Sequence, residues 1–191
     1  MRRVIPLKER PVDIALVVFF AINLVFITYM IDTEQLVIDD PRDFDYPVWP
    51  PRFIIDAVHW WGFNFDPALI ARPPWWRATI WIDQIFFGPF YAAALYAYVK
   101  GKAWIRIPSI IWGSVMITNV TVILFEEFLG PHASDDLGIV VFANASWILF
   151  PVVTIARMWT AGEEPFTEPD PGATGIPDAP PAGSIPPPGV A

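Results

Sequence analysis

The sequence predicts an all-α membrane protein: a four-transmembrane-helix bundle with a Trp- and Pro-rich outer loop and a disordered C-terminal tail. Two observations carry this prediction. Of the 191 residues, 54% are hydrophobic, and the mean hydropathy is +0.44, which exceeds what a soluble domain of this size needs to fill its core. The apolar residues are also gathered into four blocks, each close to the ~20 residues that cross a ~30 Å hydrocarbon core as a helix.

The four blocks are expected to be the spans, and they run over residues 12–31, 79–99, 108–128 and 138–159. A basic N-terminus precedes the first block, as it would in a signal peptide. That block is too long for a cleaved leader, and the polar sequence Asp32-Thr33-Glu34 follows it instead of a small-residue cleavage site. Strands are excluded because a membrane strand needs only ~10 residues and alternates in polarity.

The segment between the first two blocks is rich in Trp and Pro and is expected to cap the bundle. Residues 53–63 are predicted to form a short amphipathic helix, with Ile54, Ile55 and Val58 facing the membrane. Trp75 is expected to anchor the second span in the interface. We therefore expect one transmembrane domain over residues 1–161. The Pro-, Gly- and Ala-rich residues 162–191 are expected to be disordered.

Basic residues give the orientation. They cluster before the first span, in the short loop 100–106 and at Arg157, which places these regions on one side if all four blocks cross. Both termini are then cytoplasmic. The membrane is the inner membrane if the source is bacterial and the endoplasmic reticulum if it is eukaryotic.

Composition also excludes several classes of partner. The chain has no cysteine and two histidines, so no metal site is expected. Its net charge of −8 and its lack of a basic stripe argue against nucleic acid. No cofactor is expected, and a homodimer is left open.

Four polar side chains fall at a similar depth in the expected spans. Asp32 ends the first span, Asp83 lies about one turn inside the second, Glu126 is near the end of the third, and Asn144 is less than two turns into the fourth. Ionisable groups within spans usually face a cavity or a partner. The alternatives are that Asp32 and Glu126 are hydrated at the interface and that Asn144 bonds a neighbouring helix.

Two nearby carboxyl groups would not both stay ionised, because each disfavours the charge of the other. Such a pair could accept a cationic amine or move a proton on and off an apolar substrate. Trp147 is one turn from Asn144 and could stabilise positive charge with its ring, although packing is an equal alternative. Tyr29 could line the same cavity.

A family resemblance rests on two motifs. They are Trp81-Ile-Asp-Gln-Ile-Phe-Phe-Gly-Pro-Phe90 and the run Tyr96-Ala-Tyr-Val-Lys-Gly, continued by Trp104-Ile-Arg-Ile-Pro-Ser-Ile-Ile111. Over about residues 14–160 the chain resembles the EXPERA family, which contains sigma-two receptors and emopamil-binding sterol isomerases. The receptor branch is the more similar one.

The resemblance implies a helical bundle around a cavity that binds sterols and lipophilic amines. It implies that Asp32 and Asp83 line the pocket, with Asp83 one methylene shorter than the family's Glu. In the isomerase branch a His and a Glu four residues apart transfer protons. This chain has Thr28 and Asp32 at those places, whereas Asn144 and Trp147 match the Asn–Trp pattern of the isomerases.

Three functions follow for comparison. The first is binding of a sterol-like or isoprenoid lipid, or a lipophilic amine, in an acidic intramembrane cavity. The second is a double-bond isomerase that works through a carbocation, with Asp32, Asp83 or Glu126 as the catalytic proton carriers. The third is a non-catalytic subunit or chaperone of a membrane complex. Expected ligand-contacting residues are Asp32, Asp83, Tyr29, Thr28, Glu126, Asn144 and Trp147.

Overall fold

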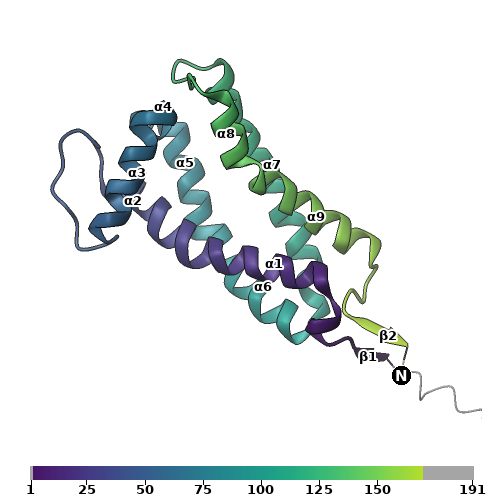
Figure 1. Cartoon of the computed structure of the whole chain (residues 1–191). Coiled ribbons are helices and arrows are strands. Elements are labelled where there is room, and N and C mark those ends of the chain that lie inside the picture. Colours follow the sequence, from purple (N-terminus) through teal and green to yellow (C-terminus); the bar gives the residue numbers. More distant parts are fainter. Residues whose placement is uncertain (1, 170–191) are drawn as a thin grey trace, which may run out of the picture.

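The computed structural model describes residues 2–169 and consists mainly of four long helical runs (Figure 1). The first run joins α1 (Pro11–Ile22), the π-helical segment η2 (Asn23–Asp32) and α2 (Thr33–Val37). The second joins α5 (Pro74–Ile82), the π-helical segment η3 (Asp83–Phe87) and α6 (Gly88–Lys100). The third consists of the short 3-10 turn η4 (Ala103–Ile105) and α7 (Arg106–Leu129), and the fourth of α8 (Leu137–Asn144) and α9 (Ser146–Thr160).

Within residues 2–169, three helical stretches are long and apolar enough to cross a membrane: Pro11–Val37, Ala103–Leu129 and Leu137–Thr160. They contain three of the expected spans. The run 74–100 has a similar length but carries Asp83 and Gln84 near its middle. It is not one of the three stretches that are apolar enough to cross. The predicted helical fold, with three helices long and apolar enough to cross a membrane, is therefore confirmed, and a span over residues 79–99 stays a prediction.

Aromatic side chains hold the four runs together. α1 packs on α6, and α7 packs on α9. Between them Phe20 and Trp112 are fully buried with ring centroids 5.3 Å apart, and Phe90 stacks on Trp112 at 5.0 Å. In lipid, helices gain little from the hydrophobic effect, so close van der Waals and aromatic contacts of this kind keep them associated.

The end of the bundle that carries α3 (Arg52–Phe65) and α4 (Pro67–Ala71) is called the cap end below (Figure 1). The expected amphipathic helix is present as α3, but its predicted orientation is wrong. Ile54, Ile55 and Val58 are buried; Ile54 and Val58 pack in one cluster with residues of α4 and α5, rather than facing the membrane. The segment folds back over the helix ends, so its apolar face is covered by protein.

The opposite end, the terminal end, is closed by a two-stranded sheet. β1 (Arg2–Val4) pairs antiparallel with β2 (Thr167–Pro169), and the 3-10 turn η1 (Leu7–Glu9) leads into α1. Phe166 is fully buried, with the guanidinium of Arg10 4.8 Å from its ring centroid. The expected disordered tail thus does not start at Gly162. The rest of that prediction, residues 170–191, lies outside the described residues.

Candidate functional site

A cavity of about 330 Å³ lies between the helical runs near the cap end, and its size is within the range of small-molecule sites. Residues from all four runs and from the α3–α4 segment line it, and most of them are apolar or aromatic. The lining residues are Ile27, Ile31, Asp32, Gln35, Trp61, Asp66, Leu69, Trp76, Thr79, Ile80, Asp83, Met116, Asn119, Val120, Ile123, Ala143, Asn144 and Trp147.

Asp83 is the first residue of the π-helical segment η3, and it lies 7% exposed on the cavity wall. The hydroxyl of the fully buried Thr28 donates a hydrogen bond to its carboxylate. Gln84 donates to the carbonyl of Thr28 and, at 3.1 Å, to the hydroxyl of Thr33. These bonds join the two π-helical segments, a kind of wide turn that occurs frequently at functional sites.

Asp32 ends the other π-helical segment, η2, and is also 7% exposed on the cavity wall. It accepts a long hydrogen bond of 3.4 Å from the Gln35 amide. The Gln35 carbonyl oxygen accepts in turn from Trp76 Nε1 at 2.6 Å. A carboxylate has lone pairs for about four donors, so Asp32 retains capacity to accept further bonds from a bound molecule.

On the fourth run, Asn144 and Trp147 line the cavity. Trp147 Nε1 donates to Asn23 Oδ1 at 2.8 Å, and Asn23 donates to the Phe19 carbonyl at 2.8 Å. This chain of bonds fixes the indole of Trp147 against the first run. The Asn144 amide donates to the Val140 carbonyl of its own helix at 3.0 Å, so this donated bond does not bridge helices.

The other expected ligand-contacting residues lie outside the cavity lining. Thr28 is behind Asp83, as described above. Tyr29 is 41% exposed, and its carbonyl accepts from Trp49 Nε1 at 2.7 Å. Glu126 accepts a hydrogen bond from the backbone N–H of His132 at 3.0 Å, whereas the adjacent Glu127 is the fully buried carboxyl of this pair.

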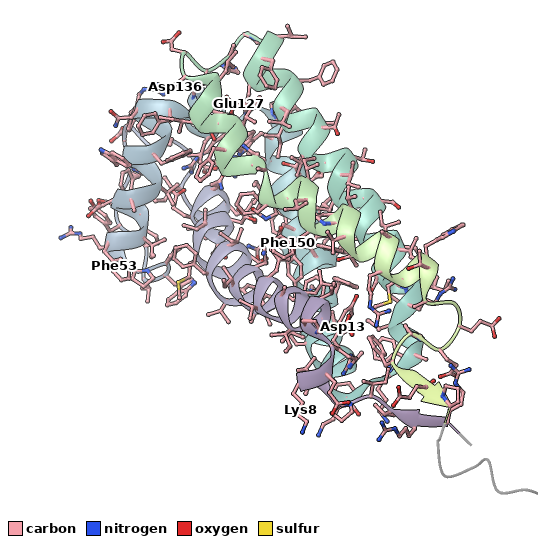
Figure 2. All side chains as sticks on the ribbon, turned by 45° about the vertical axis from the view of Figure 1, so that its right-hand side comes forward. Lys8, Asp13, Phe53, Glu127, Asp136 and Phe150 are labelled. Atoms are coloured by element: carbon pink, nitrogen blue, oxygen red, sulfur yellow. The ribbon has the colours of Figure 1, made fainter. Side chains whose placement is uncertain are left out.

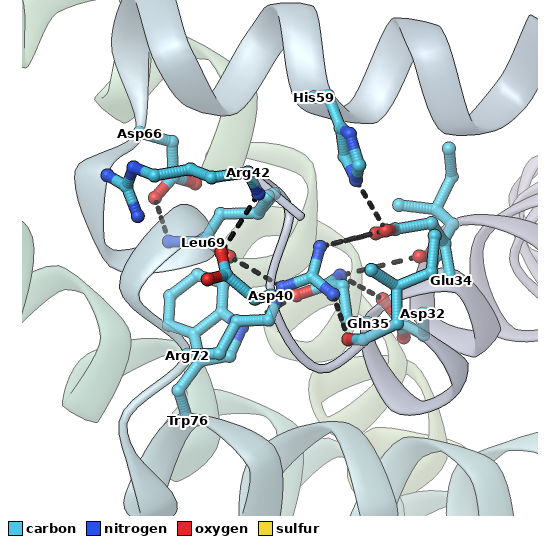
Figure 3. Close-up of polar contacts among 12 residues, drawn as sticks. Asp32, Glu34, Gln35, Asp40, Arg42, His59, Asp66, Leu69, Arg72 and Trp76 are labelled. Atoms are coloured by element: carbon cyan, nitrogen blue, oxygen red, sulfur yellow. Dashed lines mark hydrogen bonds and ion pairs between the residues drawn. The ribbon is translucent and has the colours of Figure 1, made fainter. Parts of the chain in front are cut away.

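Sequence reasoning missed a buried ion cluster beside the cavity, and Figure 3 shows its residues. Arg72 Nη2 lies 2.8 Å from both carboxylate oxygens of Glu34, and His59 Nε2 lies 2.8 Å from Glu34 Oε1. His59 belongs to α3 and is only 8% exposed. These three residues, Glu34, His59 and Arg72, are called the Glu34 cluster below. The cluster links α2, α3 and the end of α4 beside the cavity.

Asp66 also lines the cavity and was missed, although the sequence carried a signal for it. It is the N-cap of α4, with Pro67 at the first helical position, and its Oδ1 accepts from Leu69 N–H at 2.9 Å (Figure 3). Burial raises the pKa of Asp66 from its usual value, while the neighbouring Glu127 and the bond from Leu69 act in the opposite direction.

Comparisons with known proteins agree with the sequence resemblance. The family model described as EXPERA (EXPanded EBP superfamily) matches residues 53–158. The chain is 28% identical to sigma intracellular receptor 2 of Xenopus tropicalis over 151 residues, covering 73% of this chain and 84% of the relative. It is 30% identical to sigma intracellular receptor 2 of Homo sapiens over 129 residues, covering 64% of this chain and 68% of that protein.

Proposed function

Since the chain belongs to the EXPERA (EXPanded EBP superfamily) family of membrane proteins, we propose that it binds a lipophilic molecule in the cavity between its helices. The ligand is a sterol-like or isoprenoid lipid, or a lipophilic amine. The observation that carries this proposal is the pairing of two nearly buried carboxyl groups, Asp32 and Asp83, with an otherwise largely apolar lining.

Electrostatics favours a ligand with a basic or hydroxyl group. A carboxylate removed from water loses its hydration, and the loss is offset only by a counter-charge or by hydrogen bonds. Thr28 and Gln35 give Asp83 and Asp32 one donor each. An ammonium or hydroxyl between the two acids would supply the remaining donors, and Ile27, like the other apolar residues of the wall, suits a hydrocarbon body.

The proposed placement in the membrane follows from the same residues. We propose that the run 74–100 also crosses the membrane, as the second of four spans. Asp83 then faces the cavity, since an acid in a span is costly unless it faces a cavity or a partner. With the basic terminal end in the cytoplasm, the cap end and the cavity lie toward the outer leaflet.

Mass spectrometry of co-purified lipids and amines tests the proposal. The wild type and the variant Asp83→Asn are purified in the same mild detergent. Asparagine keeps the volume and an acceptor for Thr28 while removing the charge, so we expect a bound molecule in the wild type and its depletion in the variant. Asp135→Asn, at an exposed position of the α7–α8 loop, is the matched control. No enriched molecule in any of the three proteins would exclude a tightly held ligand.

A double-bond isomerase is the second candidate, and one contact favours it. The Thr28 hydroxyl and the Asp83 carboxylate are hydrogen-bonded on the first two runs, near Trp147 on the cavity wall. Isomerisation needs a carboxylic acid that protonates the alkene and a carboxylate that removes a proton from the resulting carbocation. Asp83, held by Thr28, and Asp32 both lie on the cavity wall and could fill these two roles, and the ring face of Trp147 could stabilise the cation. Turnover of a sterol alkene by the wild type, or by Thr28→His, would favour this function over binding alone. A non-catalytic subunit would show bound lipid unchanged by Asp83→Asn.

A further inference from the structure

The terminal end of the molecule carries exposed positive charge, although the whole chain has a net charge of −8. Three exposed lysines contribute this charge: Lys8 in η1, Lys100 in the last turn of α6, and Lys102 just before η4. Figure 2 shows Lys8 at this end of the bundle, beyond Asp13. The residues Lys8, Lys100 and Lys102 are called the lysine surface below.

Contacts between η1 and α6 bring the three lysines onto one surface. Arg10 follows η1 and donates from Nη2 to the Tyr98 carbonyl near the end of α6, at 2.7 Å. The Lys102 N–H donates to the Ala97 carbonyl at 2.8 Å, which folds the turn after α6 against the end of that helix. Lys8 lies two residues before Arg10, and η1 contacts α6 directly. The lysine surface therefore surrounds the C-terminal end of α6.

Within residues 2–169 the three ammonium groups have no carboxylate partner, because none of the ion pairs there includes a lysine. Asp13, the buried acid of this end, is held instead by Arg10 at 2.8 Å and by Arg157 at 3.1 Å. The C-terminal carbonyls of α6 favour a cation at Lys100, but they account for only one of the three lysines. The lysine surface thus carries charge that the described part of the fold leaves uncompensated.

The lysine surface lies where the helices end. All four helical runs begin or end at the terminal end (Figure 1). Trp104 and Trp159 are 54% and 70% exposed there, and exposed tryptophans are typical of the boundary between hydrocarbon and headgroups. A lysine near the end of a span extends its ammonium group toward that boundary while its stem lies on apolar surface. With the proposed spans, the lysine surface lies in the headgroup layer.

The opposite charge of the cap end selects the kind of headgroup. Among the exposed side chains of the cap end are five aspartates: Asp39, Asp40, Asp43, Asp45 and Asp56. An anionic headgroup is repelled at that end and attracted at the terminal end. A zwitterionic headgroup has no net charge, so it distinguishes the two ends much less.

We propose that the lysine surface binds the phosphate groups of anionic phospholipids, whose acyl chains lie along the exposed Val99, Trp104 and Ile107. A lysine ammonium is a compact charge with three donors, and it suits a phosphate that approaches from the surrounding bilayer. The binding surface is on the outside of the bundle. The inference is therefore independent of the cavity and of its ligand.

Binding of two short-chain lipids to the full chain tests the proposal. Dioctanoyl phosphatidylglycerol and dioctanoyl phosphatidylcholine have the same acyl chains, and microscale thermophoresis in one uncharged detergent measures their Kd values. We expect phosphatidylglycerol to bind the wild type about fivefold more tightly for each lysine that its headgroup contacts. This preference should shrink as the salt rises from about 0.1 M to about 1 M, because the Debye length falls from ~10 Å to ~3 Å.

Three variants locate the preference on the molecule. It should be lost in the triple variant Lys8→Gln/Lys100→Gln/Lys102→Gln and kept in Lys8→Arg/Lys100→Arg/Lys102→Arg, which retains the charge. The matched control removes the same number of positive charges from exposed or part-exposed positions of the cap end and should keep the preference: Arg42→Gln/Arg52→Gln/Arg77→Gln. Thermal unfolding in the same detergent verifies that each variant is folded.

Several outcomes would overturn the proposal. They are equal Kd values for the two lipids in the wild type, a preference that survives the three glutamines, and equal losses in the glutamine variants of the two ends. Displacement of phosphatidylglycerol by inorganic phosphate at the same concentration would also overturn it, since the partner would then be a free anion. If the lysine-to-glutamine variant does not fold, a wild-type preference that is insensitive to salt decides against the proposal. Asp83→Asn should leave the preference unchanged, so a failure of the cavity proposal is distinguishable.

Discussion

The hydroxyl of Thr28 donates a hydrogen bond to the carboxylate of Asp83, so a side chain of the first helical run holds the acid of the second. Thr28 is fully buried, and Asp83 is 7% exposed. Each residue belongs to a π-helical segment, in which the widened turn shifts the register of the side chains that follow. This contact sets how the Asp83 carboxylate is presented to the cavity.

Thr28→Val should therefore destabilise the protein and weaken ligand binding. Valine has nearly the shape of threonine but no donor, so the nearly buried Asp83 carboxyl loses the hydrogen bond that it accepts from the first helical run. The expected loss is ~1.5–3 kcal/mol in the free energy of unfolding. Thermal unfolding in detergent measures it, with Thr28→Ser, which keeps the hydroxyl, as the control. A Val variant as stable as the Ser variant would mean that the hydrogen bond contributes little.

Gly88→Ala should disturb the same contact by a steric route. A Cβ at residue 88 would lie 2.9 Å from the Tyr29 hydroxyl and 3.2 Å from Thr28 Cγ2. Overpacking of this kind typically costs ~1–3 kcal/mol. We expect a lower unfolding temperature and weaker amine binding.

Gly138→Ala is the matched control for that substitution. Its Cβ would lie 3.6 Å from its nearest neighbour, Asp136 Oδ1, and alanine favours helix by ~0.5–1 kcal/mol over glycine. The control should thus be neutral or stabilising. Equal destabilisation by the two alanines would argue against close packing at Gly88.

The sequence predicted the helical runs well because apolar blocks of span length have few alternatives in a membrane. The first run exceeds its predicted span, 12–31, since the helix continues through polar residues to Val37. Counting residues along each expected span also placed Asp32, Asp83 and Asn144 at a similar depth in the membrane, and all three line one cavity.

Rotation of a side chain about its helix could not be read from depth. Glu126 and Glu127 lie at nearly the same depth, but ~100° of rotation separates a half-buried loop contact from a fully buried carboxyl. The Glu34 cluster could not be predicted for a different reason. Glu34, His59 and Arg72 are distant in sequence, and only the folding back of α3 and α4 brings them together.

Arg72→Ala should be among the most destabilising substitutions in the Glu34 cluster. It leaves the fully buried Glu34 carboxylate with only the hydrogen bond to His59, and breaking a buried ion pair on one side costs ~3–5 kcal/mol. Arg77→Ala is the matched control, since Arg77 pairs with Asp39 at 2.9 Å on the surface and such pairs are worth ~0–1 kcal/mol. Chemical denaturation of both variants compares the two losses. Similar losses would show that burial does not strengthen the Glu34 pair.

The raised pKa of Asp66 predicts how stability depends on pH. Burial raises the pKa of this carboxyl in the folded protein above its ordinary value of 3.8. The folded state therefore binds the proton more tightly than the unfolded state does. This contribution to stability is fully present below the unfolded pKa and is lost as the pH rises through the folded pKa.

Unfolding temperatures of the wild type and Asp66→Asn between about pH 4 and about pH 8 measure this contribution. Asparagine keeps the oxygen that accepts from Leu69 N–H but cannot titrate, so the variant should gain stability relative to wild type as the pH rises. Asp66→Ala removes both the titrating carboxyl and the hydrogen bond that caps α4. Loss of the cap should lower the free energy of unfolding by ~1 kcal/mol at every pH, which distinguishes it from the pH-dependent effect of the charge. Glu127 faces Asp66, so Glu127→Gln should change the same part of the profile. Parallel profiles for the wild type and Asp66→Asn would show that the Asp66 carboxyl titrates alike in the folded and unfolded states.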